Sequence, residues 1–174
     1  MKERTREVIE IVGIFGLIAS LIFVGMQMML DRRIAMGNQF HDRTEIGHEG
    51  MIAQFQSDAW VAMQAREWEA GFLPDWWNEK ITAYQQEHGY SMKDIVRLEL
   101  SARMRLVRMN NNYFQHQLGL ISDETWDNIS PSGEVYQRDP VYAAVAAQGG
   151  GVLEPGYRKL IQEALESIER TSSL

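Results

Sequence analysis

The longest uninterrupted apolar segment of the chain is Ile11–Leu30, with the sequence IVGIFGLIASLIFVGMQMML. Its 20 residues include no charged side chain. At a rise of 1.5 Å per residue, a helix of this length is about 30 Å long, which matches the hydrocarbon thickness of a bilayer. The pattern therefore predicts a transmembrane helix near the amino terminus, with the span at about residues 9–30.

The residues that flank this segment distinguish an anchor from a secretory signal. Lys2, Arg4 and Arg6 precede the apolar run, as basic residues do in signal peptides. A signal h-region, however, has about 7–15 residues and ends at a small-x-small cleavage site. This run is longer and ends in MQMMLDRR, which offers no such site. We therefore expect residues 1–33 to form an uncleaved anchor in the lipid bilayer.

Two further features of the anchor leave alternatives open. Gly16 and Ser20 have the small-xxx-small spacing that lets two spans approach closely, although glycine is common in membrane helices in any case. The positive-inside rule hardly decides the orientation, because basic residues flank both ends of the span: Lys2, Arg4 and Arg6 before it, and Arg32, Arg33 and Arg43 after it.

Helical spacing of apolar residues recurs through the rest of the chain, and no run shows the alternation typical of a strand. The sequence predicts an all-α fold, in which the transmembrane helix is followed by a small helical domain at residues 34–174. The anchor helix is expected to continue beyond the membrane. A break is expected near Gly47 or Gly50, because a glycine costs a helix about 1 kcal/mol relative to alanine.

Capping residues predict the first helices of the domain. Ser57 is expected to cap a helix that ends at the turn 71–74, and Asp75 to start a short helix that Gly89 stops. The aromatic residues of this region, including Trp76, are expected to be core, although they could instead mark a membrane interface.

The longest helix of the domain is predicted at residues 91–118. Ser91 is a plausible N-cap with Asp94 three residues later, and Gly119 suits the position after the helix end. Its apolar residues form a wide face that can pack against two neighbours. We expect core contacts between this helix and the last helix of the chain, through Leu98, Met109, Phe114 and Leu118 on one side and Leu160, Ile161 and Leu165 on the other.

The carboxy-terminal third is predicted to be short helices. Ser122 opens one of them, residues 130–133 are expected to be a loop, and Pro140 starts the next. Glycines 149–151 interrupt the pattern, and the final amphipathic helix begins near Pro155.

The segments GLIASLIFVGMQM and NNNYFQHQLGLISDETW resemble a widespread, uncharacterised bacterial family of short, single-span, membrane-anchored proteins with a helical soluble domain. The resemblance implies a bacterial inner (plasma) membrane location, and it brings no established activity and no catalytic residues. Family members place basic residues after the span, which favours a cytoplasmic location for the soluble domain. In this chain Lys2, Arg4 and Arg6 precede the span and reduce the charge difference between its two ends. The sequence therefore leaves undecided which side of the membrane holds the soluble domain.

Composition narrows the classes of partner and cofactor. The net charge of −7 disfavours nucleic acid, whose binding proteins usually carry a basic surface. The chain has no cysteine, which excludes disulfides, thiolate metal sites and cysteine nucleophiles. We expect no cofactor.

A metal site is the first chemical possibility. Glu45 and His48 have the Glu-x-x-His spacing of helical di-iron sites, and His41 lies one turn earlier. Such a centre needs a second Glu-x-x-His and two further glutamates, which the sequence does not supply. We favour a solvated polar face and predict no metal.

The segment 110–116, NNNYFQH, is unusually polar for a helix that must pack. Asn110, Tyr113 and His116 are candidate ligand-binding residues in a small-molecule pocket. Alternatively, Asn110 and Tyr113 satisfy buried polar groups where neighbouring helices end, which is the more usual role of such residues.

Five basic residues lie on the long helix, whereas the stretch 42–87 is acidic. Ion pairing between the basic helix and the acidic stretch within the domain accounts for both features. The alternative is that the basic helix lies on the surface of an anionic lipid bilayer. The basic residues are Lys93, Arg97, Arg103, Arg105 and Arg108.

Three functional hypotheses follow. The first is a non-enzymatic single-pass membrane protein whose helical domain mediates protein interaction, either as a homo-oligomer or as an accessory subunit of a larger membrane complex. The second is a membrane-tethered module that senses a small ligand. The third, and least favoured, is a metal-dependent enzyme.

Overall fold

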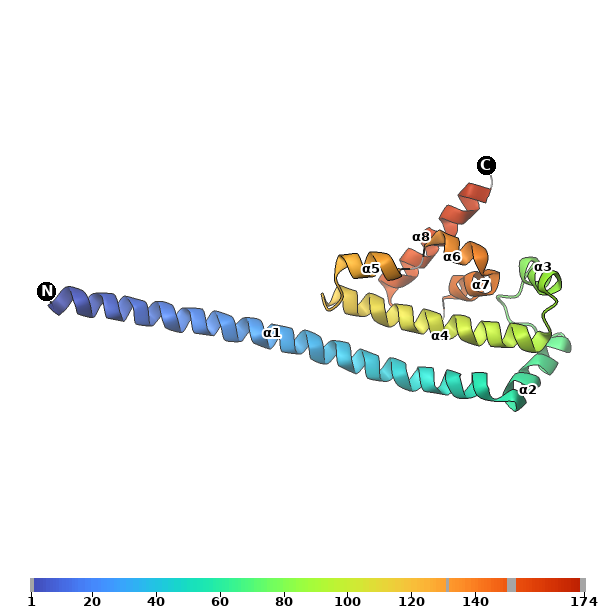
Figure 1. The fold of residues 1–174 in the computed structure, drawn as a ribbon, viewed down its shortest axis with the longest axis horizontal. Coiled ribbons are helices and arrows are strands. Elements are labelled where there is room, and N and C mark those ends of the chain that lie inside the picture. Colours follow the sequence, from blue (N-terminus) through green and yellow to red (C-terminus); the bar gives the residue numbers. More distant parts are fainter. Residues whose placement is uncertain (1, 131, 150–152, 173–174) are drawn as a thin grey trace. The chain divides into compact units, whose positions relative to one another are not determined.

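We describe a computed structural model that places residues 2–130, 132–149 and 153–172. These residues form eight helices and no strand, which confirms the all-α prediction. The helices of Figure 1 are α1 (Lys2–Gln56), α2 (Asp58–Glu69), α3 (Glu79–His88), α4 (Met92–Gln117), α5 (Asp123–Ile129), α6 (Gly133–Arg138), α7 (Pro140–Gln148) and α8 (Pro155–Ser172). The chain divides into two compact units, Met1–Gln39 and Phe40–Leu174, and each is described by itself.

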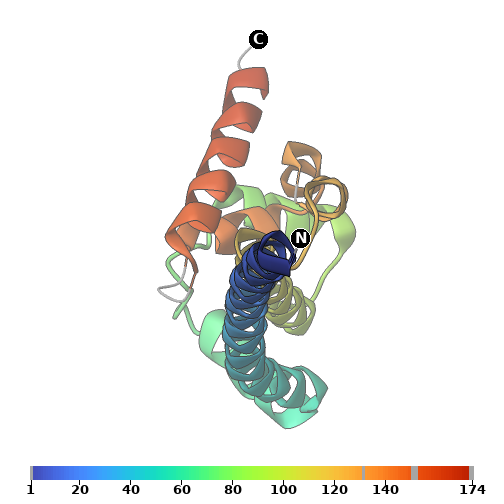
Figure 2. The same ribbon diagram turned by 90° about the vertical axis from the view of Figure 1, so that its left-hand side faces the viewer.

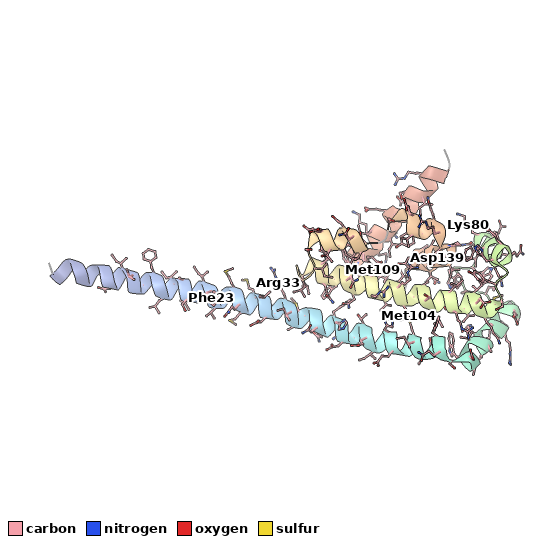
Figure 3. All side chains as sticks on the ribbon, viewed as in Figure 1. Phe23, Arg33, Lys80, Met104, Met109 and Asp139 are labelled. Atoms are coloured by element: carbon pink, nitrogen blue, oxygen red, sulfur yellow. The ribbon has the colours of Figure 1, made fainter. Side chains whose placement is uncertain are left out.

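The first unit is the amino-terminal part of α1. In the part of the chain that the structure describes, this is the one helix long and apolar enough to cross a membrane. Signal sequences and core helices of soluble proteins can have the same length and composition. Here, however, the large apolar side chains are exposed, as the projecting side chain of Phe23 illustrates in Figure 3. Gly16 and Ser20 are also exposed, so the predicted pairing face is open.

The expected break near Gly47 or Gly50 is wrong, because α1 continues through both glycines to Gln56. Helix propensity is a weak tendency that tertiary contacts override. Here the two glycines lie between Phe40, whose ring stacks on Phe114 at 4.3 Å between centroids, and Phe55, which packs against the domain core. The Ser57 hydroxyl caps the start of α2, so the chain turns only after Gln56.

Helix α4 is the centre of the second unit and packs between α2 and α7. The predicted capping box is confirmed, since Ser91 Oγ accepts from the Asp94 backbone and Asp94 Oδ2 accepts from the Ser91 backbone at 2.8 Å. These hydrogen bonds lower the pKa of Asp94. Gly119 follows the end of α4 with φ of 72°, a left-handed conformation that favours glycine.

Aromatic side chains form much of the core. Trp68 and Trp76 are buried and pack edge to face, which confirms that this region contributes to the core. Tyr136, Tyr142 and Tyr157 are fully buried around α6, α7 and α8. Burial raises the pKa of all three phenols above the ordinary value of 10.0.

The packing predicted between α4 and the last helix is only partly right. Ile161 is buried, but Leu160 is 40% exposed, and Phe114 faces Phe40 rather than α8. The short helices α6 and α7 lie between, and α8 packs mainly against them. Both views show the carboxy-terminal half of α8 extending away from the other helices of this unit (Figures 1 and 2).

Two boundaries also differ from the predictions. Helix α3 begins at Glu79 rather than Asp75, because the Asn78 side chain accepts from the backbone N–H of Ile81 and forms the cap. The predicted loop at 130–133 ends one residue early, because α6 begins at Gly133. The starts of α7 at Pro140 and α8 at Pro155 are confirmed, whereas residues 150 and 151 of the predicted glycine break lie outside the described residues.

Candidate functional site

The polar segment at the end of α4 contributes to packing between helices. Asn110 is buried, and its Oδ1 accepts a hydrogen bond of 2.7 Å from the backbone N–H of Glu154, just before α8. The His116 ring stacks on Trp126, and its Nε2 lies 2.8 Å from Asp123 Oδ1. Asn110 therefore connects α4 to the segment that precedes α8, and His116 connects α4 to α5.

Tyr113 packs against the start of α8. Its ring contacts those of Trp126 and Tyr157, with centroids 5.6 and 5.8 Å away. A Cβ added to Gly156 would overlap the Tyr113 hydroxyl and lie 2.9 Å from Cζ. The Tyr113 hydroxyl thus occupies the space that any larger residue at position 156 would need.

The metal candidates do not assemble a ligand set in the structure. His41 Nε2 lies 3.8 Å from Glu45 Oε2, and His41 Nδ1 lies 3.0 Å from the side-chain amide of Asn111. Within residues 2–130, 132–149 and 153–172, no three His, Asp or Glu side chains are arranged to hold a metal ion.

Three arginines of α4 have acidic partners within the domain. Arg97 pairs with Asp58 on α2, and Arg103 pairs with Glu99 one turn earlier on α4. Arg105 lies 3.2 Å from Asp139, which stands at the α6–α7 junction in Figure 3. Ion pairs within the domain therefore account for these three arginines of α4.

A hollow of about 520 Å³ lies between the last turns of α1 and the middle of α4. We call it the α1–α4 groove. Its size is within the range of pockets that hold small ligands. Most of the lining side chains are apolar, and α7 and the segment before α8 complete it. The lining residues are Phe40, Arg43, Thr44, Gly47, Met51, Arg103, Leu106, Val107, Asn110, Val145 and Leu153.

The two helices run antiparallel (Figure 1), and ring stacking joins them at one end of the groove. Phe40 stacks on Phe114 at one end. At the other, Met51 and Arg103 together line a second hollow of about 290 Å³ that continues toward α2. Between these ends α1 presents Gly47, where an added Cβ would meet no atom within 4 Å. The missing side chain leaves the middle of the groove open.

Arg43 gives the groove its charge. It forms no hydrogen bond or ion pair with any residue that the structure describes, and the sequence explains why. Its neighbours one turn away on α1 are Gln39, Phe40, Ile46 and Gly47, none of which is acidic. The other polar groups of the lining are engaged: Thr44 donates to the Phe40 carbonyl, Arg103 pairs with Glu99, and Asn110 accepts from Glu154.

Comparison with protein-family models, with curated proteins and with solved structures finds no match to this chain. The family resemblance of the anchor and the NNNYFQHQLGLISDETW segment therefore stays a prediction.

Sequence reasoning selected Asn110 but missed Arg43 and Gly47. Two local signals were available. An arginine without an acidic residue three or four positions away is uncommitted on its own helix, and a glycine inside a stable helix leaves space beside it. Which helix would face that space, however, depends on tertiary packing that periodicity does not give.

Proposed function

We propose that the protein is a single-pass protein of the bacterial inner membrane and that its helical domain is a non-enzymatic binding module. The observation that carries the binding role is the α1–α4 groove, an open apolar hollow in a domain whose core is otherwise packed with aromatic side chains. Its lining holds no carboxylate or histidine, and its one hydroxyl, on Thr44, donates to backbone. These groups suit binding better than acid–base or nucleophilic catalysis.

The membrane part of the proposal is supported by the uncharged segment Ile11–Leu30 and by its exposure. We expect the full-length chain to stay in the membrane pellet after extraction with alkaline carbonate. A chain recovered in the soluble fraction, or a mature amino terminus beyond residue 25, would contradict the anchor.

The proposal puts the domain on the cytoplasmic side, following the lean that the family resemblance gives. Because the chain has no cysteine, a single Lys159→Cys variant supplies a unique thiol on the exposed face of α8. A membrane-impermeant maleimide should label this thiol only after the cells are lysed. Labelling in intact spheroplasts would reverse the orientation.

A protein partner is the other form that binding can take, through self-assembly or as a subunit of a larger membrane complex. The observation that favours it is the loop after α2, where Phe72 is 77% exposed and Leu73 is 42% exposed. Exposed apolar residues of this kind often belong to interfaces. A native pulldown from solubilised membranes, with Phe72→Ser as the comparison, tests for a stoichiometric partner.

A further inference from the structure

The shape of the α1–α4 groove indicates what kind of molecule fits it. Its wall on α1 extends from Phe40 to Met51, about 16 Å along the helix. A volume of about 520 Å³ spread along this length describes an elongated hollow. An elongated molecule that lies along α1 therefore fits it.

The charges of the groove indicate the ends of that molecule. Arg43 lies one turn from the Phe40 end and has an uncommitted guanidinium. At the Met51 end the one charged residue of the groove lining, Arg103, is paired with Glu99. Beyond it the second hollow is lined by the apolar residues Met51, Trp60, Trp68, Pro74 and Leu100 and by Gln54, Gln64, Glu99 and Arg103. The complementary ligand therefore has one anionic end and a long apolar body.

We propose that the α1–α4 groove binds a long-chain fatty acid, with its carboxylate on Arg43 and its alkyl chain running toward Met51. A guanidinium forms paired hydrogen bonds with a planar carboxylate, and the apolar lining removes the chain from water. The inference rests on the proposed binding role of the domain and specifies its ligand. The bilayer to which the chain is anchored is a source from which such a ligand partitions.

The test uses full-length protein in phosphatidylcholine nanodiscs with a photoactivatable analogue of palmitate, followed by peptide mapping of the cross-links. We expect labelling of the peptides that contain Met51 and Leu106, and competition by unlabelled palmitate. Methyl palmitate, which lacks the negative charge, should compete about ten-fold less well or worse, since hydrogen bonds to charged groups commonly contribute that much.

Two pairs of variants separate the groove from general effects. Gly47→Leu fills the groove and should reduce its labelling about ten-fold, whereas Gly50→Leu adds the same side chain at an open position outside the lining and should leave it unchanged. Arg43→Gln should reduce labelling about ten-fold, whereas Arg66→Gln removes an exposed charge on α2 and should not. Circular dichroism confirms that each variant is folded.

Several results would overturn the inference. One is equal labelling of the groove in wild type and Gly47→Leu, and another is equal competition by palmitate and its methyl ester. Stronger labelling by a photoactivatable phosphatidylglycerol would assign the groove to a phospholipid instead. Displacement of palmitate by a copurifying peptide would assign it to a protein. Carbonate extraction reports the anchor separately, so failure of fatty-acid binding and failure of membrane anchoring are distinguishable.

Discussion

At the scale of single residues, glycines have opposite roles at two places in this chain. Gly47 and Gly50 lie in α1 with open space where a Cβ would be, whereas Gly156 lies against the Tyr113 ring. The sequence shows the same residue in a predicted helix each time. Whether a larger residue fits at a glycine position depends on the side chains that other helices place beside it.

We expect Gly156→Ala to lower the free energy of unfolding by about 1–3 kcal/mol, the usual cost of overpacking, despite the better helix propensity of alanine. The reason is that the Tyr113 ring is held by Trp126 and Tyr157 and cannot move away freely. Thermal unfolding measures the effect. Tyr113→Phe removes the overlapping oxygen and should recover part of the loss in the double variant. Gly50→Ala, in open space, should keep or raise the melting temperature.

The buried tyrosines predict a loss of stability at alkaline pH. Burial, above all other causes, raises the pKa of Tyr136 and Tyr157 well above the ordinary value of 10.0. The folded state therefore holds these protons more tightly than the unfolded chain. The stability that results is complete below about pH 10 and is lost as the pH rises further, because the unfolded phenols then ionise.

Tyr136→Phe should make the denaturant midpoint less sensitive to pH between about 9 and 11, since one ionising phenol is removed from the unfolded state. Far-ultraviolet circular dichroism follows unfolding, and the tyrosinate absorbance reports ionisation in the same samples. Identical pH dependence in wild type and variant would show that this phenol is not protected.

At the scale of elements, the sequence predicts helix ends well where one side chain or one glycine determines them. The caps at Ser57, Ser91 and Ser122 and the stop at Gly119 follow from local hydrogen bonding and backbone conformation. The predictions fail where tertiary contacts decide. Packing of Phe55 against the core and the cap at Ser57 come after Gly50, and α1 ends only at Gln56. The competing caps Asp75 and Asn78 differ little in sequence alone.

The capping box of α4 gives a prediction with a defined pH range. Asp94→Ala should lower the free energy of unfolding at neutral pH by about 0.3–1.5 kcal/mol, the usual contribution of one capping interaction. The Ser91 hydrogen bonds lower the pKa of the Asp94 carboxyl, so its contribution is present above the ordinary value of 3.8 and is lost as the pH falls through the lower folded value. Urea titrations at neutral and acid pH measure it. A difference between wild type and variant that persists when Asp94 is protonated would contradict the charge-dependent account.

At the scale of the whole molecule, the predicted all-α class is confirmed, yet the groove was not predictable. Periodicity identifies which face of a helix is apolar but not which helix covers it. Helix α4 illustrates the difference, because its apolar stripe was assigned to α8, whereas α2 and α7 cover it and the end of α1 leaves part of it open. Arg43 and Gly47, on which the proposed binding role depends, lie on the neighbouring helix α1.

Self-association of the protein depends on which apolar residues stay exposed on the folded domain. Trp68 and Trp76 are buried in the domain core, so they are not available to an interface between copies. The exposed apolar residues between them include Phe72 and Leu73. The proposed membrane anchor would confine the copies to two dimensions and so raise their effective concentration. We therefore predict a homodimer of the full-length protein in mild detergent.

Light scattering on the full-length protein measures its oligomeric state. Two variants compare the contribution of the helical domain to self-association with that of the apolar helix. Phe72→Ser should shift the protein toward monomer by more than Gly16→Ile does, because contacts between spans contribute only about 1 kcal/mol each, whereas an apolar anchor at an interface can contribute about 2 kcal/mol or more. The reverse order would assign the dimer to the Gly16–Ser20 face of the span. A monomer at micromolar concentration in all three proteins would exclude self-assembly, and the protein partner would then have to be a different chain in a larger membrane complex.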